Sequence, residues 1–205
     1  MYEIVKIAQS QLGYTERSDG WTKYGQWYAD NIAKHNSFAC APWCAMMLSW
    51  CANEAGILDG KVFPNTSPQG SSCPSMLKWF EEQGCRYPAS ELPLIGDPVF
   101  FDWNNDGSPD HVGIIYSVEG VTPSECIIKS IEGNVNNTVT IRSIYYTDSR
   151  VLATVRPKYA ESYSDALTTM AQMCIDGFMG GGNDRERMLY EAIQGRVNEL
   201  VYSGK

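Results

Sequence analysis

The hydrophobic pattern of the first half of the chain predicts helices. Residues 3–12 place apolar side chains three and four positions apart, and Gly13 follows as a natural helix end. Residues 43–55 are apolar on every side and are closed by Gly56, which predicts a helix buried inside a domain. A further short helix is predicted over residues 75–83.

The pattern changes after Leu92 to short runs of β-prone residues separated by turn residues. We expect five strands, over residues 99–102, 111–118, 126–131, 138–145 and 151–156. Helices first and strands afterwards, joined by short links, predict an antiparallel sheet packed on N-terminal helices, which is the α+β class.

The last part of the chain returns to helical spacing around a glycine-rich turn. Pro157 ends the last predicted strand, so we expect one domain over residues 1–157, a linker over 158–164 and a small all-helical module over 165–205. The turn at 180–182 separates the two apolar helical faces of this module, which is a candidate for oligomerisation.

Composition and charge narrow the classes of function. The 205 residues carry 16 basic and 24 acidic side chains, which gives a formal net charge of −8. A protein that binds duplex nucleic acid needs a surplus of basic residues, and binding to an anionic membrane surface needs the same. We therefore expect neither nucleic acid nor a membrane as a partner.

Hydropathy and the first residues bear on localisation. No apolar run is long enough to span a bilayer, and the N-terminus lacks the basic stretch and apolar core of a signal peptide. We therefore expect a chain that is made in a cytoplasm and is not exported by the ordinary route.

Seven cysteines and two histidines limit the candidate chemistry. An odd number of cysteines without a signal peptide does not indicate a disulfide framework. Zinc is disfavoured because no CxxC pair occurs beside the two histidines. Most of the cysteines are therefore expected to be small buried apolar residues.

Cys44 differs from the other cysteines because Pro42 lies just upstream and the long apolar helix follows directly. The partial positive charge at a helix N-terminus favours thiolate over thiol, which makes such a cysteine a better nucleophile. A buried structural role is the simpler interpretation of a lone cysteine. The assignment of Cys44 as nucleophile therefore depends on finding a base.

His111 begins a predicted strand and is the candidate base. If this strand pairs with the next as a hairpin centred on loop 119–125, Tyr116 faces Ile127 and His111 falls opposite Glu132. Directly opposed residues have Cβ atoms about 5 Å apart. The hairpin therefore predicts contact between the imidazole and the carboxylate.

Glu132 at that position accepts a hydrogen bond from His111, fixes its tautomer and stabilises the imidazolium, as the third member of a triad does. Asn134 is a second candidate for this orienting role. The alternative interpretation is an exposed hairpin end with ordinary polar residues. His35 has no such companion and is read as a surface residue.

A polar loop before His111 offers oxygen ligands at alternate positions, with Gly107 at the sixth. This is the first part of an EF-hand-type loop and predicts a structural, non-catalytic calcium site. Gly113 occupies the twelfth position, where a bidentate Glu is expected, so an Asx-rich turn is the alternative. The candidate ligands are Asp102, Asn104, Asp106 and Asp110.

Several motifs together resemble the CHAP family, the cysteine, histidine-dependent amidohydrolases/peptidases. They occur in the family's order and cover about residues 1–157, and they are the segments 24–28 (YGQWY), 41–52 (APWCAMMLSWCA), 96–103 (GDPVFFDW), 110–114 (DHVGI) and 131–134 (IEGN). The resemblance implies a papain-like fold and peptidoglycan as the substrate.

The same resemblance implies that Cys44 attacks a carbonyl, that His111 moves the proton, and that Glu132, with Asn134 near, orients the imidazole. It implies cleavage of an amide bond, either as an N-acetylmuramoyl-L-alanine amidase or as an endopeptidase, with no cofactor required for catalysis. The aromatic residues Trp43 and Trp103 either bind substrate or belong to the core.

The C-terminal segments 175–187 and 194–200 resemble the cell-wall-binding repeat of some phage lysozymes, in one copy and with a shorter segment around 189–192. A CHAP domain joined to such a module resembles a phage endolysin, which is made in the host cytoplasm and reaches the wall after release. Two alternatives stay open: a cysteine peptidase or acyl transferase that acts on proteins, and a non-catalytic wall-binding protein.

Overall fold

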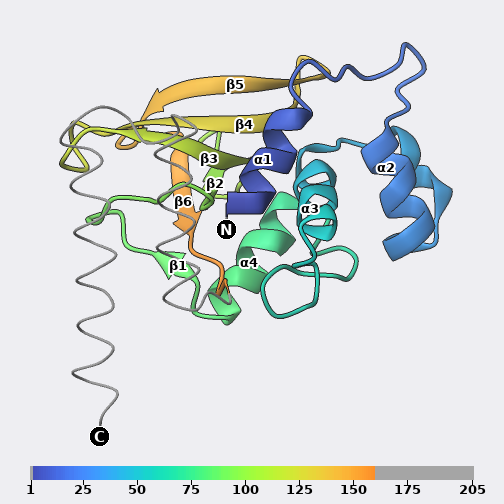
Figure 1. The fold of residues 1–205 in the computed structure, drawn as a ribbon, viewed down its shortest axis with the longest axis horizontal. Helices are drawn as coiled ribbons and strands as arrows, with labels where there is room; N and C mark the ends of the chain where they lie inside the picture. The colour runs from blue at the N-terminus through green and yellow to red at the C-terminus, as the bar shows by residue number, and fades with distance from the viewer. Residues whose placement is uncertain (1, 160–205) are drawn as a thin grey trace, which may run out of the picture.

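The computed structural model describes residues 2–159, in which helices lie beside an antiparallel sheet (Figure 1). The predicted module over 165–205 and most of the predicted linker lie outside the described residues. Within residues 2–159, no helix is long and apolar enough to cross a membrane.

The predicted helices are confirmed to within a few residues at each end. The helical elements are α1 (Tyr2–Ser10), α2 (Lys23–Tyr28), the π-helix η1 (Ala29–Ala33), the 3₁₀-helix η2 (Asn36–Cys40), α3 (Cys44–Glu54) and α4 (Cys73–Glu82). Side-chain caps start three of them. Thr22 accepts a hydrogen bond from the Gly25 amide before α2, His35 accepts one from the Ser37 amide before η2, and Ser72 accepts one from the Ser75 amide before α4.

Six strands form one antiparallel sheet in the order β1-β6-β2-β3-β4-β5. Their bounds are β1 (Arg86–Tyr87), β2 (Pro98–Phe101), β3 (His111–Glu119), β4 (Ile127–Val135), β5 (Thr138–Tyr145) and β6 (Val151–Val155). The five predicted strands are confirmed, and β1, with two residues, is too short to leave a sequence pattern. The architecture agrees with the α+β class.

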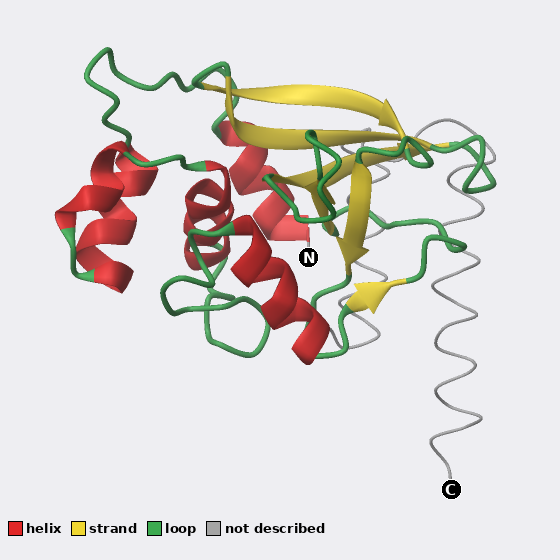
Figure 2. Cartoon of the chain, turned by 180° about the vertical axis from the view of Figure 1, so that it is seen from behind, coloured by secondary structure: helices red, strands yellow, loops and turns green. Residues whose placement is uncertain are grey.

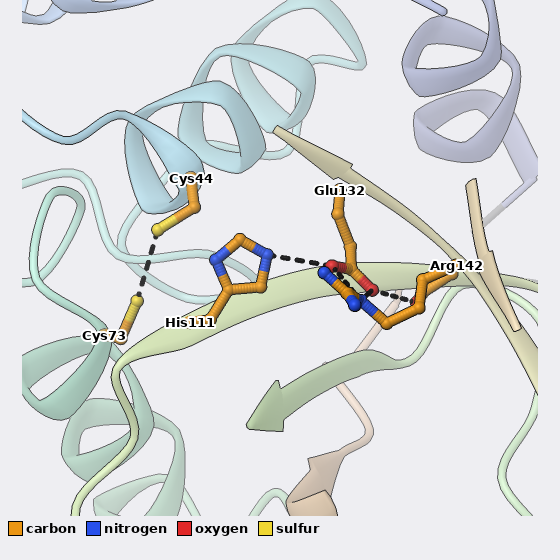
Figure 3. Close-up of polar contacts among 6 residues, drawn as sticks. Cys44, Cys73, His111, Glu132 and Arg142 are labelled. Carbon is orange, nitrogen blue, oxygen red and sulfur yellow. Dashed lines mark hydrogen bonds and ion pairs between the residues drawn. The ribbon is translucent and has the colours of Figure 1, made fainter. Parts of the chain in front are cut away.

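The helices gather on one side of the sheet, as the two opposite views show (Figures 1 and 2). Helices α1 and α3 pack against the middle of the sheet, and α4 lies nearest to β6. The core between the layers contains Trp43 and Met46 of the helical layer and Phe100, Ile114 and Ile131 of the sheet, all 0–1% exposed. This packing brings the start of α3 to the end of the sheet where β3 begins (Figure 3).

The register of the β3–β4 hairpin differs from the expected one. Glu119 faces Ile127 at the turn, and Gly113, not His111, faces Glu132. The direct opposition expected for His111 and Glu132 is therefore wrong. Near the turn the pairing is shifted by three residues from the expected register, because the ladder begins at Glu119 and Ile127. An irregularity around Tyr116 reduces the shift to two residues in the rest of the hairpin.

Candidate active site

Cys44 is the first residue of α3 and is 8% exposed. The N-cap residue, Trp43, makes no side-chain hydrogen bond to the backbone N–H groups of the first turn. The backbone N–H of Ala45 contributes to lowering the pKa of the Cys44 thiol. The helix start therefore directs its positive end at the thiol, as the sequence predicts.

His111 lies between Cys44 and Glu132 (Figure 3). Its Nε2 is 2.9 Å from Oε2 of Glu132, and the Cys44 sulfur on the other side raises the pKa of the ring. Because Nε2 carries the proton that the carboxylate accepts, Nδ1 is the nitrogen left for the thiol. The expected contact between His111 and Glu132 is present, although it is made diagonally across the two strands.

Glu132 is completely buried and has three side-chain partners. Besides His111, the Ser130 hydroxyl donates to Oε1 at 2.6 Å, and Nε of Arg142 donates to both oxygens at 2.9 and 3.2 Å. Directly opposite on β3 is Gly113, where a Cβ would lie 2.6 Å from Cγ of Glu132. The glycine leaves the space through which the carboxylate reaches His111.

These contacts keep the carboxylate charged. Burial alone would raise the pKa of Glu132, but the bonds from His111, Ser130 and Arg142 lower it below its ordinary value. For His111, burial alone would lower the pKa, whereas the bonds and charges of Cys44 and Glu132 raise it to about 9. The imidazole is therefore protonated at neutral pH.

Cys73 is a further neighbour of the nucleophile, and its Sγ lies 3.6 Å from Sγ of Cys44 (Figure 3). Its hydrogen bond is the largest cause that holds the pKa of Cys44 well below its usual range; His111 and the Ala45 amide act in the same direction, against burial. The same bond, together with burial, raises the pKa of Cys73 well above its usual range. Cys44 is thus the thiolate and Cys73 the thiol.

The other predicted site residues lie outside this group. Asn134 has a left-handed backbone with φ of 63°, next to an irregularity in the β4–β5 ladder. Among the residues described, Glu132 accepts a hydrogen bond from His111, and no hydrogen bond joins Asn134 to the imidazole. Of the two candidates for the orienting role, Glu132 is the one that contacts the imidazole.

The two tryptophans predicted either to bind substrate or to belong to the core differ in their surroundings. Trp43 is 0% exposed, stacks on Tyr24 and donates its indole N–H to Glu16, so substrate contact by Trp43 is corrected to a core role. Trp103 is half-buried and lies under the guanidinium of Arg142, at 4.4 Å from the ring centre. Trp103 therefore covers Arg142, which is an ion-pair partner of Glu132.

The polar loop before His111 is folded as a turn that its own side chains hold. Asp102 accepts from the amides of Asp106 and Gly107, Asn104 from that of Asp106, Asp106 from that of Ser108, and Asp110 from that of Trp103. Within residues 2–159, no group of three or more His, Cys, Asp or Glu side chains is arranged to hold a metal ion. These side-chain bonds to backbone amides are those of an Asx-rich turn, and calcium binding by the loop stays a prediction.

Four residues of the site escaped the sequence reasoning: Cys73, Gly113, Ser130 and Arg142. Sequence patterns could have indicated two of them, Cys73 and Arg142. Ser72 and a proline within the next two residues mark a helix start at Cys73. Asn136 and Asn137, both with positive φ, form a two-residue turn that would have brought Arg142 close to Glu132.

A cavity of about 450 Å³ lies away from the site, along the edge formed by β1 and β6, and neither Cys44 nor His111 lines it.

A scan against models of protein families found no match for this chain, and a search of curated proteins found none either. The site's own chemistry therefore carries the functional argument.

Proposed function

We propose that this protein is a cysteine-dependent hydrolase that cleaves an amide bond of bacterial peptidoglycan. The observation that carries the chemistry is the linear arrangement of Cys44 at a helix start, His111 beside it, and buried Glu132 on the far nitrogen of the ring. Nucleophile, base and orienting group in this order constitute the arrangement that covalent acyl transfer requires.

In the proposed reaction, the Cys44 thiolate attacks the amide carbonyl and the substrate oxygen becomes an oxyanion. Backbone N–H groups at the start of α3 stabilise that charge, because no side chain of the N-cap residue competes for them. His111, protonated at neutral pH, gives its proton to the leaving amine. Water then hydrolyses the thioester, with His111 as general base.

The choice of substrate is supported by the CHAP-like motifs, which contain all three residues: Cys44 in 41–52, His111 in 110–114 and Glu132 in 131–134. The wall-binding resemblance of the C-terminal segment supports the same substrate. Together they favour an endolysin-type enzyme that acts on the wall after release from the cell where it is made. Amidase and endopeptidase remain the two forms of this proposal.

The test is digestion of purified Gram-positive cell walls by the full chain and by Cys44→Ala, with the new termini identified by mass spectrometry. Cys40→Ala is the matched control, because Cys40 is an exposed cysteine outside the site. We expect wild type and Cys40→Ala to release the same fragments and Cys44→Ala to release none. A new carboxyl on the lactyl group of muramic acid, together with a new amino terminus on L-alanine, identifies an amidase. New termini inside the stem peptide or cross-bridge, with muramic acid still joined to its peptide, identify an endopeptidase.

Equal digestion by wild type and Cys44→Ala would refute Cys44 as nucleophile. If no wall is digested, a thiol-reactive probe at neutral pH separates the two alternatives. Selective labelling of Cys44 would redirect the search to protein substrates, and the absence of a reactive cysteine would favour a non-catalytic wall-binding protein.

A further inference from the structure

The mechanism proposed above uses one sulfur, but the site contains two. Cys44 and Cys73 are the first residues of α3 and α4, and their sulfurs point toward each other at 3.6 Å (Figure 3). Cys73 is 5% exposed, and its thiol makes no contact with the carboxylate network of Glu132 among the bonds described. A second sulfur, which forms no covalent bond in the proposed hydrolysis, therefore faces the reactive one.

The two sulfurs differ in protonation, and the difference sets an order of reaction. The thiolate of Cys44 reacts first with an electrophile, because thiolates and not thiols are oxidised. The pKa of Cys73 is high mainly because Cys44 is charged and bonded to it. Once Cys44 has lost its negative charge by oxidation, the main cause that keeps Cys73 protonated disappears.

We propose that Cys44 and Cys73 form an oxidation site that reacts with peroxide and closes into a reversible disulfide, which switches the enzyme off and protects its nucleophile. This inference rests on the proposed function in one respect, since Cys44 is the nucleophile there.

The steps balance with hydrogen peroxide as the oxidant. The Cys44 thiolate attacks one peroxide oxygen, the O–O bond breaks, and hydroxide leaves, which gives a sulfenic acid on Cys44. The Cys73 sulfur then attacks the Cys44 sulfur, the S–O bond breaks, and the hydroxyl group leaves as water with the proton of the Cys73 thiol. A dithiol restores both thiols by exchange and is itself oxidised.

The geometry requires only a local change. A disulfide has an S–S bond of about 2.05 Å, so the sulfurs must approach by about 1.5 Å from their 3.6 Å separation. Both side chains stem from the first turns of their helices, where rotation about one side-chain bond moves the sulfur by this amount. The bond would occupy the Cys44 electron pair that attacks the substrate, so the oxidised enzyme has no nucleophile.

The experiment treats the full chain with hydrogen peroxide, blocks the remaining thiols and maps the peptides by mass spectrometry without reduction. We expect a peptide that joins Cys44 to Cys73 and lacks the mass of two hydrogen atoms. Wall digestion is measured before treatment, after it and after addition of dithiothreitol. We expect loss of activity after peroxide and its return after reduction.

Cys73→Ser and Cys73→Ala test the role of the second sulfur, each compared with its own untreated activity. Without Cys73, Cys44 is expected to proceed to the sulfinic and sulfonic acids, so that dithiothreitol no longer restores activity. Cys40→Ser, which removes an exposed cysteine away from the pair, should recover like wild type.

Oxidised wild type that carries sulfinic Cys44 and no joined peptide would overturn the proposal, as would full recovery of both Cys73 variants. If neither variant folds, the joined peptide in the wild type decides. Wall digestion that is absent even before treatment refutes the proposed function alone, because the joined peptide is read by mass and needs no substrate.

Discussion

At the scale of single residues, the proposed catalysis depends on the charge of Glu132. A buried carboxylate without partners would take up a proton and could no longer hold an imidazolium. The Ser130 hydroxyl and the Arg142 guanidinium prevent this, and Trp103 covers Arg142 in turn. The charged Glu132 then adds to the effect of Cys44 in raising the pKa of His111, and its hydrogen bond orients the ring.

The pKa of His111, about 9, predicts different pH profiles for two reactions of the same cysteine. Alkylation needs only the thiolate, so its rate should rise as Cys44 loses its proton and then stay level through pH 9. Hydrolysis also needs the imidazolium as an acid, so its rate should fall as the pH rises through about 9. Iodoacetamide labelling and wall digestion across this range measure the two profiles.

Glu132→Gln tests whether His111 is the group whose titration lowers the hydrolysis rate at alkaline pH. Glutamine retains an oxygen for His111 but removes the negative charge that raises its pKa, so the alkaline limb of hydrolysis should move to lower pH. The rise of the alkylation rate at acid pH should change less, because it follows the pKa of Cys44. The hydrogen bond from Cys73 is the largest cause that lowers this pKa. An alkaline limb that stays in place in Glu132→Gln would show that His111 is not the titrating acid.

The site residues could be predicted from the sequence to the extent that local pattern marks them. Cys44 lies two residues after Pro42 and begins an apolar helix, and His111 begins a β-prone run. Trp43 was misplaced because an aromatic residue beside a nucleophile has the same pattern whether it lines a cleft or, as here, is 0% exposed. Cys73 is brought to Cys44 by helix packing, which no local pattern reports.

At the scale of secondary-structure elements, the β3–β4 hairpin shows why an inexact register still gave the correct pair. The partner of Glu132 is Gly113, two residues from the expected His111. Side chains alternate between faces, so a shift of two keeps Glu132 on the face of His111, whereas a shift of one would have turned it away. A long side chain then spans the diagonal.

Gly113 leaves room for the diagonal contact between Glu132 and His111, so we expect Gly113→Ala to lower the rate of wall digestion. The new methyl group would lie 2.6 Å from Cγ of Glu132, and the backbone carbonyl of Ile131 at 3.1 Å leaves it little room on the other side. The carboxylate has to shift away from His111, and a misplacement of this size costs about 100-fold in rate. Initial rates of wall digestion measure the loss, and circular dichroism confirms the fold.

A double-mutant cycle with Glu132→Ala isolates this cause, because alanine lacks the Cγ that the new methyl group meets. In the Glu132→Ala background, Gly113→Ala should therefore cost little further activity. Losses that multiply in the double variant would show that Gly113 acts through the backbone of β3 and not through the position of the carboxylate.

The loop 102–110 marks a limit of pattern reading at the same scale. Alternating oxygen side chains serve equally as ligands or as caps for backbone amides, and the sequence does not distinguish these uses. The structure shows the amides of Asp106 and Gly107 on Asp102, and that of Trp103 on Asp110. These bonds close the loop immediately before His111 and so fix where β3 begins.

At the scale of the whole molecule, the sheet order depends on contacts that the sequence could not supply. The last strand, β6, lies between β1 and β2, far from its predecessor β5. Arg156, just after β6, donates to both oxygens of Asp97, just before β2, at 2.9 and 3.3 Å. Asp97 is completely buried and also accepts from the amide of Leu94, so this pair joins both segments.

This pairing predicts a pH-dependent loss of stability in Arg156→Met. Removing the cation leaves the Asp97 carboxylate buried and unpaired, which costs about 3–5 kcal/mol in the free energy of unfolding. Burial already raises the pKa of Asp97, and losing Arg156, which lowers it, raises it further. A raised folded-state pKa contributes stability below the unfolded value that is lost as the pH rises, so the variant should be weaker at pH 7 than at pH 4.

Urea unfolding of the full chain at both pH values measures the effect, and Asp97→Asn/Arg156→Met is the matched control. With no ionisable group at 97, the double variant should lose less stability than Arg156→Met at pH 7, and its loss should no longer depend on this titration. Equal losses in the single and double variants would mean that Arg156 stabilises the sheet through its stacking on Tyr87, at 3.6 Å, and not through the charge of Asp97. The joining of β6 to β2, and with it the placement of β3 and His111 beside β2, would then depend on packing alone.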